Sequence, residues 1–430
     1  MSSPNLTITA EPFEGGSVVY APLAARTSSD SPTGQLSLVL RMTNHEATAV
    51  HANTLIISFS SPPMVNTASI PVDLSIAAAQ TVGWNFATQD NIVLPVPAPD
   101  SITIGVLCDG YTSPATLTTP LAPYKSPVPN GYLFPAKVGE LKGGEFWRGR
   151  SAVHGPAGGG NQLFAHDMWI EAFDGQAGHW TDLVPGGSAS VNADARIWEK
   201  SIVAMADGTI QSWEDDIPTN PNPPADLSPP NPVEGNHFYI QHATDLVLYA
   251  HLEQGSLNPQ LTQSPSGAQV KAGDFLGLAD NSGNSSGPHL HIHAIKGTQP
   301  WQGPPRPLLF REINVIDRSA INPPDPSGPW VTVTDHGLPS ADALIWPSPT
   351  KPIHVSVHAF YELAIDPLAL ILPPHVYIKL TLPDPPPIEV WTREVREVVR
   401  GMTAEERKVA RARVRALGER FRVLERVFER

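Results

Sequence analysis

Three histidines spaced two residues apart are the part of this chain best suited to chemistry. His289, His291 and His293 lie in the segment Gly-Asn-Ser-Ser-Gly-Pro-His-Leu-His-Ile-His that begins at residue 283. Successive side chains of a β-strand point to opposite faces, so an extended segment places the three imidazoles on one face and Leu290 and Ile292 on the other. One such imidazole can bind a metal while a neighbour transfers protons. A merely polar, exposed strand face is the alternative interpretation of these residues alone.

The overall composition narrows the kinds of site that the chain can build. It has 430 residues, 41% of them hydrophobic and 16% charged, which is enough for about two to three domains with their own cores. We see no apolar run long enough for a membrane span and no secretion signal in the first residues. Cys108 is the only cysteine, which excludes an intrachain disulfide and a cysteine-rich zinc site. Zinc would therefore need His and Asp or Glu ligands.

The charge is unevenly distributed along the chain. The formal net charge is −14, and residues 389–430 hold 12 Arg and Lys against 8 Asp and Glu, which leaves 16 basic against 34 acidic residues before them. Phosphate binding needs a clustered basic surface. The acidic body therefore argues against nucleic acid as the main partner.

Short β-like runs separated by Ser, Pro, Asp or Asn turns fill residues 1–125 and predict an antiparallel, immunoglobulin-like β-sandwich. Several prolines between residues 120 and 135 predict a linker. Residues 136–315 predict a second domain of antiparallel strands, because they show no long helical period. The fold class that we expect is mainly β.

Two further segments complete the expected organisation. Residues 316–388 are punctuated by proline and predict a β extension of unassigned role. Residues 389–430 predict a charged helical tail, since Thr403-Ala-Glu-Glu is a capping-box pattern and apolar residues follow at spacings of four and three. Docking of this helix against its own protein is the simpler expectation, and self-association through it is the alternative.

Four sequence blocks of the second domain together resemble one known family. They are Phe-Ala-His-Asp at 164–167, Val-Ala-Met-Ala-Asp-Gly-Thr-Ile at 203–210, Leu-Tyr-Ala-His-Leu at 248–252, and the segment from Gly273 to His291 that ends in Pro-His-Leu-His. With these blocks, residues 145–315 resemble the lysostaphin-type zinc metallopeptidases, the M-twenty-three peptidase family, many of which cut peptide cross-links in bacterial cell walls. The resemblance covers a little over a third of the chain.

The resemblance implies a role for each matching residue. His291 corresponds to a zinc ligand and Asp167 to the carboxylate ligand, whereas His251 and His289 match the two histidines that take part in catalysis without binding the metal. Alternation along a strand at 246–252 is consistent with this division, because it places Tyr249 and His251 on the same face. We leave His237 and His242 as surface residues. His293 either orients a ligand or is an exposed strand residue.

The first zinc ligand departs from the family pattern His-x-x-x-Asp, because Leu163 stands four residues before Asp167. His166 is adjacent to Asp167 and would face away from it on a strand. His154 is the candidate that we favour, because the glycine-rich segment after it is flexible enough to bring the side chain beside Asp167. His179 and a site with only two ligands remain alternatives.

The function implied by the resemblance is that of a zinc-dependent endopeptidase acting on peptide or peptidoglycan. Three protein ligands, His154, Asp167 and His291, would leave the fourth position of Zn²⁺ open to water, and His251 and His289 would transfer protons. A non-catalytic relative that binds peptide or activates another hydrolase is the main alternative, and an adhesion or assembly protein is a third class. An extracellular or cell-envelope location is implied by the resemblance alone.

Overall fold

Strands dominate the computed structural model. It describes residues 2–60, 68–86, 92–142, 144–149, 160–174, 177–221, 232–318, 330–339, 342–350, 353–356 and 376–379. Two short 3-10 turns, η1 (Val138–Glu140) and η3 (Asn192–Asp194), interrupt the strands. The prediction of a mainly β protein is confirmed, whereas the predicted helical tail at 389–430 lies outside the described residues. No helix in the described part of the chain is long and apolar enough to cross a membrane.

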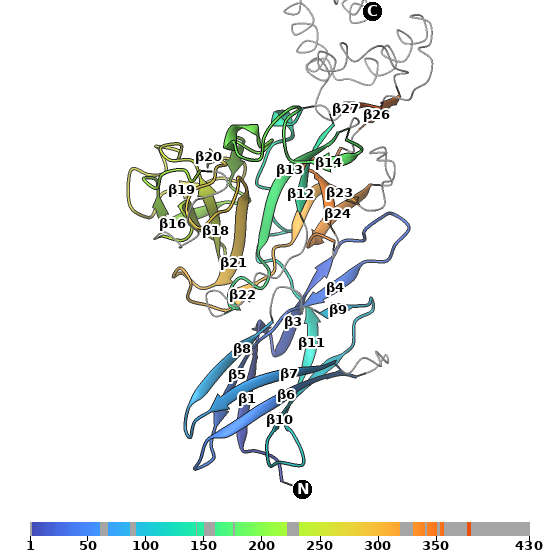
Figure 1. Cartoon of the computed structure of the whole chain (residues 1–430), viewed down its shortest axis with the longest axis vertical. Coiled ribbons are helices and arrows are strands. Elements are labelled where there is room, and N and C mark those ends of the chain that lie inside the picture. Colours follow the sequence, from blue (N-terminus) through green and yellow to red (C-terminus); the bar gives the residue numbers. More distant parts are fainter. Residues whose placement is uncertain are drawn as a thin grey trace, which may run out of the picture.

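Two sheets pack face to face in the N-terminal region, which forms the lower end of the molecule in Figure 1. The smaller sheet is antiparallel and has the order β1 (Leu6–Glu11), β5 (Val39–Asn44), β8 (Thr81–Asn85). The larger sheet has the order β7 (Ala68–Ile76), β6 (Val50–Phe59), β10 (Ser101–Cys108), β11 (Ala115–Pro123), β3 (Ser17–Leu23), β4 (Thr33–Leu36), β9 (Ile92–Leu94), with β2 (Phe13–Glu14) paired to β3. Alternating apolar residues such as Leu55 and Ile57 fill the space between the sheets.

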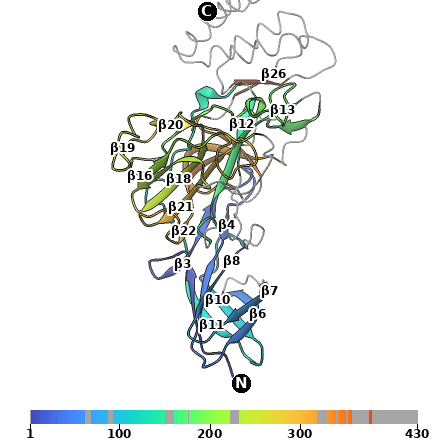
Figure 2. The same cartoon turned by 60° about the vertical axis from the view of Figure 1, so that its left-hand side comes forward.

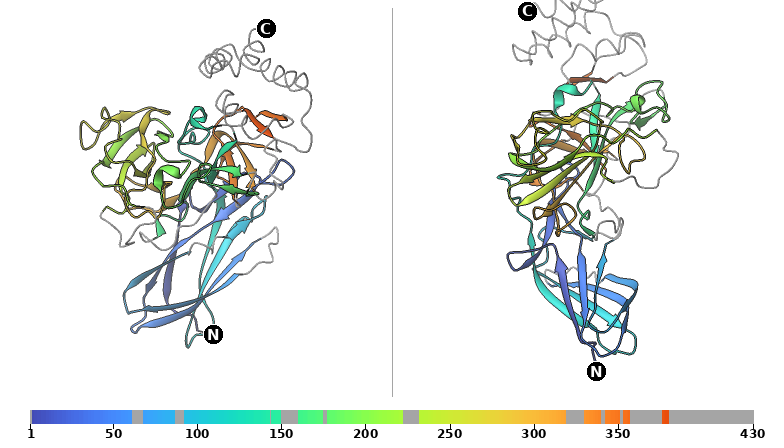
Figure 3. Two further views of the ribbon diagram at one scale, coloured as in Figure 1. Left: turned by 45° about the horizontal axis from the view of Figure 1, so that its top comes forward. Right: turned by 90° about the vertical axis from the view of Figure 1, so that its left-hand side faces the viewer.

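A third sheet, which is strongly curled, builds the central region (Figures 1 and 2). Its strand order is β19 (Gln269–Val270), β16 (Gly208–Glu214), β17 (Asn236–His242), β18 (Asp245–Leu252), β21 (Leu290–Lys296), β13 (His166–Asp174), β12 (Glu145–Gly149), β25 (Ala343–Trp346), β23 (Phe310–Asp317), β24 (Val331–His336). β14 (His179–Thr181) pairs with β13, and β22 (Pro305–Arg306) pairs with β21. The pairing of β21 with β13 joins the two lobes of this sheet, which are seen apart in the left-hand view of Figure 3.

Two short strand pairs lie outside these sheets. β15 (Ser201–Val203) pairs antiparallel with β20 (Phe275–Leu278), and Ile202 is buried in the central core. β26 (Ile353–Ser356) and β27 (Val376–Lys379) form a parallel pair.

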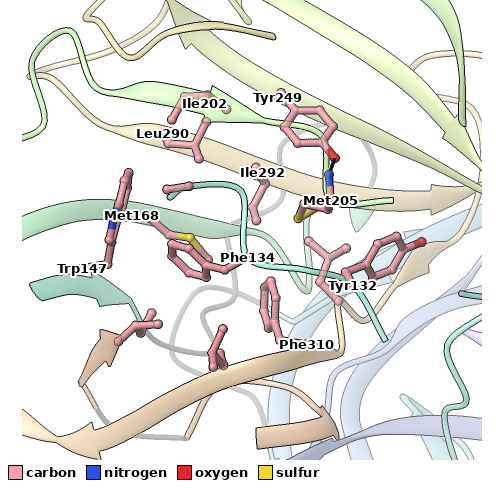
Figure 4. Close-up of a cluster of buried hydrophobic side chains, with 14 of the residues drawn as sticks. Tyr132, Phe134, Trp147, Met168, Ile202, Met205, Tyr249, Leu290, Ile292 and Phe310 are labelled. Carbon is pink, nitrogen blue, oxygen red and sulfur yellow. Dashed lines mark hydrogen bonds between the residues drawn. The ribbon is translucent and has the colours of Figure 1, made fainter. Parts of the chain in front are cut away.

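One hydrophobic core lies inside the curl of the central sheet. Figure 4 shows Leu290 and Ile292 of β21 and Met168 of β13 in this core, together with Trp147 of β12 and Phe310 of β23. Along β21, Leu290 and Ile292 alternate with His291 and His293 on the opposite face, and along β13, Met168 and Ile170 alternate with Asp167 and Trp169. The other face of β13 and β21 is thereby left for polar side chains.

Residues within the predicted linker at 120–135 and beyond the predicted boundary at 315 contribute to the central core and sheet. β11 continues to Pro123, and Tyr132 and Phe134, inside the predicted linker, are buried in the central core. β24 and β25 belong to the central sheet, and Trp346 packs in its core. Prolines predict breaks between domains, yet the apolar residues between these prolines pack in the central core, and β24 and β25 pair in the central sheet.

The sandwich and the central sheet are in direct contact at the start of β13. Leu163 and Phe164, just before β13, pack in the core of the sandwich. The amide of Gln35 donates to the Leu163 carbonyl at 3.4 Å, and the Gly337 N–H donates to the Pro22 carbonyl at 2.8 Å. The sandwich therefore holds the start of the strand that carries Asp167.

Candidate active site

Asp167 and His291 are directly opposite each other on the neighbouring strands β13 and β21. Cross-strand partners have their Cβ atoms about 4.5–5.5 Å apart, so their side chains meet on the same face. His291 Nδ1 lies 2.9 Å from Asp167 Oδ1, although the two residues are 124 positions apart in the chain. The prediction that Leu290 and Ile292 face away from the histidines is confirmed, since both are buried in the central core.

The neighbouring candidates for a zinc ligand are placed elsewhere. His166 lies opposite Ile292 on the core face, with its ring 5.8 Å from that of Phe310, so it faces away from Asp167 as expected. His179 is exposed on β14 and pairs with Asp174, seven residues further along β13 than Asp167, which corresponds to roughly 23 Å of strand. The structure does not bring His179 to Asp167. His154 lies outside the described residues.

His251 reaches the site through a local break in strand alternation. In the register of β18 and β21, Tyr249 pairs with Ile292 on the core face and Ala250 pairs with His291 on the site face. His251 has a φ of 64°, a left-handed conformation that few non-glycine residues adopt. This turns its ring toward the site, with ring centroids 4.6 Å from His289 and 5.9 Å from His291.

The predicted shared face of Tyr249 and His251 is therefore wrong. Tyr249 is fully buried, accepts a hydrogen bond from the Met205 N–H at 2.9 Å, and its hydroxyl lies 3.0 Å from His242 Nε2. Simple alternation failed because the backbone of His251, near the end of β18, is left-handed, and its ring is oriented by a contact with a residue from another segment. Its Nδ1–H donates to the Ser282 carbonyl at 2.8 Å.

His289 is held by the turn that precedes β21. Its Nδ1–H donates to the Gly287 carbonyl at 2.9 Å, with the Ser285 hydroxyl 3.2 Å away. The opposite nitrogen, Nε2, lies 3.6 Å from Asp167 Oδ1. Backbone carbonyls thus hold the protonated Nδ1 of both His251 and His289, which leaves Nε2 of each ring as the nitrogen that can accept a proton.

A close backbone approach supports these turns. A Cβ atom on Gly283 would lie 2.2 Å from the Gly235 nitrogen, and one on Gly235 would lie 2.5 Å from the Ser282 carbonyl carbon. Both glycines also have positive φ angles. The Ser282 hydroxyl donates to the Leu252 carbonyl and accepts from the Asn236 N–H. The glycines in these turns are therefore required by space as well as by conformation.

The electrostatic environment keeps His251 neutral. Burial lowers the pKa of His251 well below its ordinary value, and repulsion from protonated His289 and His291 would lower it further. A neutral imidazole is the form that can accept a proton, and the nearby Asp167 carboxylate favours the protonated ring, although burial has the larger effect. His251 is therefore unprotonated at neutral pH, as a proton acceptor must be.

Two other histidines differ from the surface positions that we expected. His237 and His242 are both buried, and burial lowers the pKa of His242 to about 4. His242 Nδ1–H donates to the Asp207 carbonyl at 3.0 Å, in the Ala-Asp-Gly block. Their flanking residues gave no periodic signal for burial, because both faces of β17 are covered.

Sequence reasoning did not find Glu234 and Trp301, which lie behind His293. His293 Nδ1 is 2.9 Å from His291 Nε2, and the ring of Trp301 lies 5.4 Å from that of His293. The Trp301 indole N–H donates to the Glu234 carboxylate. Glu234 lies in a loop far from the histidine motif in sequence, and Trp301 lies after the end of β21, so the two-residue alternation of the strand could not have identified either residue.

The donor atoms fit a metal ion only in part. His291 Nδ1 and Asp167 Oδ1 converge on one point, and imidazole nitrogen and carboxylate oxygen are both ordinary zinc ligands. Within the described ranges, no group of three or more His, Cys, Asp or Glu side chains is arranged to hold a metal. A third ligand has to come from outside those ranges if the site is complete.

The sequence match agrees with this arrangement. Residues 191–302 match the model of peptidase family M23. This part of the chain carries His251, His289 and His291, whereas Asp167 lies before it. The fold is β-rich, and the similarity to peptidase family M23 is confined to residues 191–302.

Solved structures show only distant similarity. A zinc containing peptidase from Vibrio cholerae is 13% identical, with 64% of this chain and 56% of that chain covered and a TM-score of 0.22. Csd3 from Helicobacter pylori is 10% identical, with 65% and 73% covered and a TM-score of 0.21. The chain thus spans little more than half the length of the Vibrio cholerae peptidase. TM-scores this low carry no argument, and no curated protein matches the sequence.

Proposed function

We propose that this protein is a zinc-dependent endopeptidase that hydrolyses peptide bonds, with the peptide cross-links of bacterial peptidoglycan as its substrate class. The observation that carries the proposal is the cross-strand pair of Asp167 and His291, with His251 and His289 beside it. The match to peptidase family M23 supports the reaction class. A cell-envelope location follows from the proposed substrate.

The proposed ligands are Asp167 and His291, with His154 as the third. Leu163 cannot take that place, because it is apolar and buried in the core of the sandwich. When bound, Zn²⁺ would supply Lewis acidity and lower the pKa of a bound water. The chain holds Asp167 and His291 on adjacent strands of one sheet, which fixes their separation before any metal arrives.

His251 and His289 are the proposed proton-transfer residues. Both rings are fixed by Nδ1–H bonds to backbone carbonyls, so each Nε2 keeps one orientation. His251 is neutral because of its burial and can take a proton from the attacking water. His289, whose Nε2 faces Asp167, is placed to pass a proton to the leaving amine or to stabilise the developing oxyanion.

Zinc content is the direct test of this proposal. We expect the purified chain to carry close to one zinc per molecule, and we expect His291→Ala and Asp167→Ala to lose it. His51→Ala is the matched control, because both ring nitrogens of His51 also have partners, the carboxylates of Asp73 and Asp109, but His51 is exposed on the sandwich. Substoichiometric zinc in the unmodified chain, with unchanged values in the two site variants, would refute the proposal.

A non-catalytic peptidase-like binding or activator protein is the second candidate. It is favoured by the lack of a complete ligand set within the residues that the structure describes, and by Leu163 at the position of the family's first ligand. Such a protein would bind peptidoglycan peptides without zinc. Peptide binding that persists in the presence of a strong chelator, with no hydrolysis, would favour this candidate.

The flanking segments are proposed to support the peptidase domain. The sandwich is proposed to be immunoglobulin-like, because β3 runs parallel to β11 in one sheet while β1 joins the other, so one N-terminal segment contributes to both sheets. Self-association through residues 389–430 stays a prediction. Light scattering of the full chain and of a form ending at residue 388 would test it.

A further inference from the structure

We propose that His293 is a positioning residue that fixes the ring of His291, and that Trp301 and Glu234 hold His293 in turn. The proposal rests on the proposed zinc-binding role of His291. Beyond that role, it assigns a task to a third histidine and to two loop residues that no spacing rule connects with the site.

The contact between the two histidines is direct. His293 Nδ1 lies 2.9 Å from His291 Nε2, while the other nitrogen of His291, Nδ1, lies 2.9 Å from Asp167 Oδ1. Both nitrogens of His291 therefore have fixed partners. A hydrogen bond to the nitrogen that does not bind metal sets the tautomer and the orientation of a ligand histidine.

His293 is in turn held from behind. The ring of Trp301 lies 5.4 Å from that of His293, tilted by 50°. The Trp301 indole N–H donates to Glu234, whose carboxylate also accepts from the Tyr239 hydroxyl at 2.9 Å. The Asn161 side-chain amide donates to the Trp301 carbonyl at 2.9 Å. Trp301 is thus fixed at both its ring and its backbone.

Packing alone does not explain a histidine at this position. His293 is 1% exposed and lies opposite Leu248 in the register of β18 and β21. Apart from His291, its neighbours on the same face of these strands are apolar, and Leu246, Leu248, Ala250 and Ile295 belong to one buried cluster. An apolar side chain would fill the same space without the cost of burying a polar ring. The imidazole is therefore explained by its hydrogen bond to His291.

The backbone at Trp301 is also unusual. Its φ is 60°, a conformation that bulky side chains rarely adopt. Such a conformation persists only where surrounding contacts fix it. Here those contacts are the three made with His293, Glu234 and Asn161, so the loop is held in a shape that places the indole against His293.

Zinc affinity, measured on the full chain by competition with a chelator of known affinity, tests the proposal. We expect His293→Phe to weaken zinc binding by about 10–100-fold, because phenylalanine keeps a ring against Trp301 but has no nitrogen for His291. We expect His293→Asn to restore affinity close to that of the unmodified chain, because the asparagine side-chain oxygen can take the place of Nδ1. Rescue by this variant is not expected of a purely structural residue.

The matched control is His237→Phe. His237 is also buried and bonded, through its Nδ1, to a backbone carbonyl at 2.8 Å, but not to His291. We expect it to leave zinc affinity unchanged. Thermal unfolding of every variant in zinc-free buffer separates loss of affinity from loss of fold. Trp301→Phe, which removes the indole N–H to Glu234 and leaves a smaller ring against His293, provides a second variant and is expected to weaken zinc binding less than His293→Phe.

The outcomes distinguish the two proposals. If the unmodified chain binds zinc and the His293→Phe and Trp301→Phe variants bind it equally tightly, the positioning role is refuted and the zinc proposal stands. If the unmodified chain binds no zinc, the proposed function fails and the positioning role fails with it. Weakened binding in His293→Phe, rescued in His293→Asn, supports the role.

Discussion

His51 and His291 each have partners at both ring nitrogens, yet the two histidines differ in their surroundings. On the sandwich, His51 Nδ1 lies 2.9 Å from Asp109 and Nε2 lies 2.7 Å from Asp73. In the central sheet, His291 Nδ1 lies 2.9 Å from Asp167, and Nε2 lies 2.9 Å from His293. The His51 side chain is 41% exposed and that of His291 is 7% exposed.

This difference shows why burial matters more than residue type. The carboxylates of Asp73 and Asp109 raise the pKa of His51, but water and salt screen such exposed pairs. Beside His291, the ring of His251 is buried and its pKa is lowered, so that ring is kept neutral. Similar contacts therefore give a surface ion pair in one place and a candidate active site in the other.

The largest expected effect concerns hydrolysis by the central site. We expect His251→Ala and His289→Ala each to reduce activity by about 10²–10⁴-fold, because each removes a proton-transfer group. Zinc content should stay unchanged, since neither residue is a proposed ligand. Release of amino groups from purified peptidoglycan measures the rate, and His51→Ala is the control. Full activity in both site variants would show that His251 and His289 contribute no more to hydrolysis than His51 does.

Protein stability should also depend more on the backbone of the buried site than on the exposed group of His51, Asp73 and Asp109. Gly283→Ala is expected to lower the free energy of unfolding by about 2–5 kcal/mol, through a positive φ and a clash with the Gly235 nitrogen. Gly255→Ala is the matched control, because Gly255 has a φ of 73° but open space around its Cβ position. Denaturant unfolding checks this, and equal losses in the two variants would contradict the predicted clash.

A third prediction uses pH to compare buried and exposed histidines. Because burial lowers the pKa of His242 to about 4, the unfolded chain binds a proton there first as pH falls below about 6.5. His242 should therefore cost up to about 3 kcal/mol of stability between pH 6.5 and pH 4. Asp245 and Asp280 act in the opposite direction, because burial raises their pKa values to about 6.

The His242→Gln variant isolates that contribution. Its free energy of unfolding should fall less steeply than that of the unmodified chain as pH drops from 6.5 to 4. Denaturant unfolding at several pH values provides the comparison, and parallel curves for the two proteins would show that His242 is not the titrating group.

The smallest effect is expected at His51. Its raised pKa means that its contribution to stability is present at low pH and is lost as pH rises through the folded-state pKa, the reverse of His242. We expect His51→Ala to leave the thermal midpoint nearly unchanged at neutral pH, with any difference vanishing at high salt. A large fall in the thermal midpoint that persists in high salt would show that the contacts of His51 with Asp73 and Asp109 are important for stability.

Much of the fold class and part of the site followed from local patterns. Alternation predicted that Leu290 and Ile292 would be buried and that His166 would face away from Asp167, and both predictions are confirmed. It failed at Tyr249 and His251, where a single left-handed residue ends the alternation. Local patterns did not show that β25, which lies beyond the predicted boundary at 315, pairs with β12 and β23, because that pairing is a long-range event.

The sequence by itself determined which donor atoms this protein offers and which strand faces are polar, because side-chain chemistry and the two-residue period of a strand are local properties. The tertiary structure alone decided that Asp167 meets His291, that His251 turns toward them, and that Trp301 and Glu234 lie behind His293. Strand register and loop conformation depend on contacts between residues far apart in the chain, and no short segment encodes them.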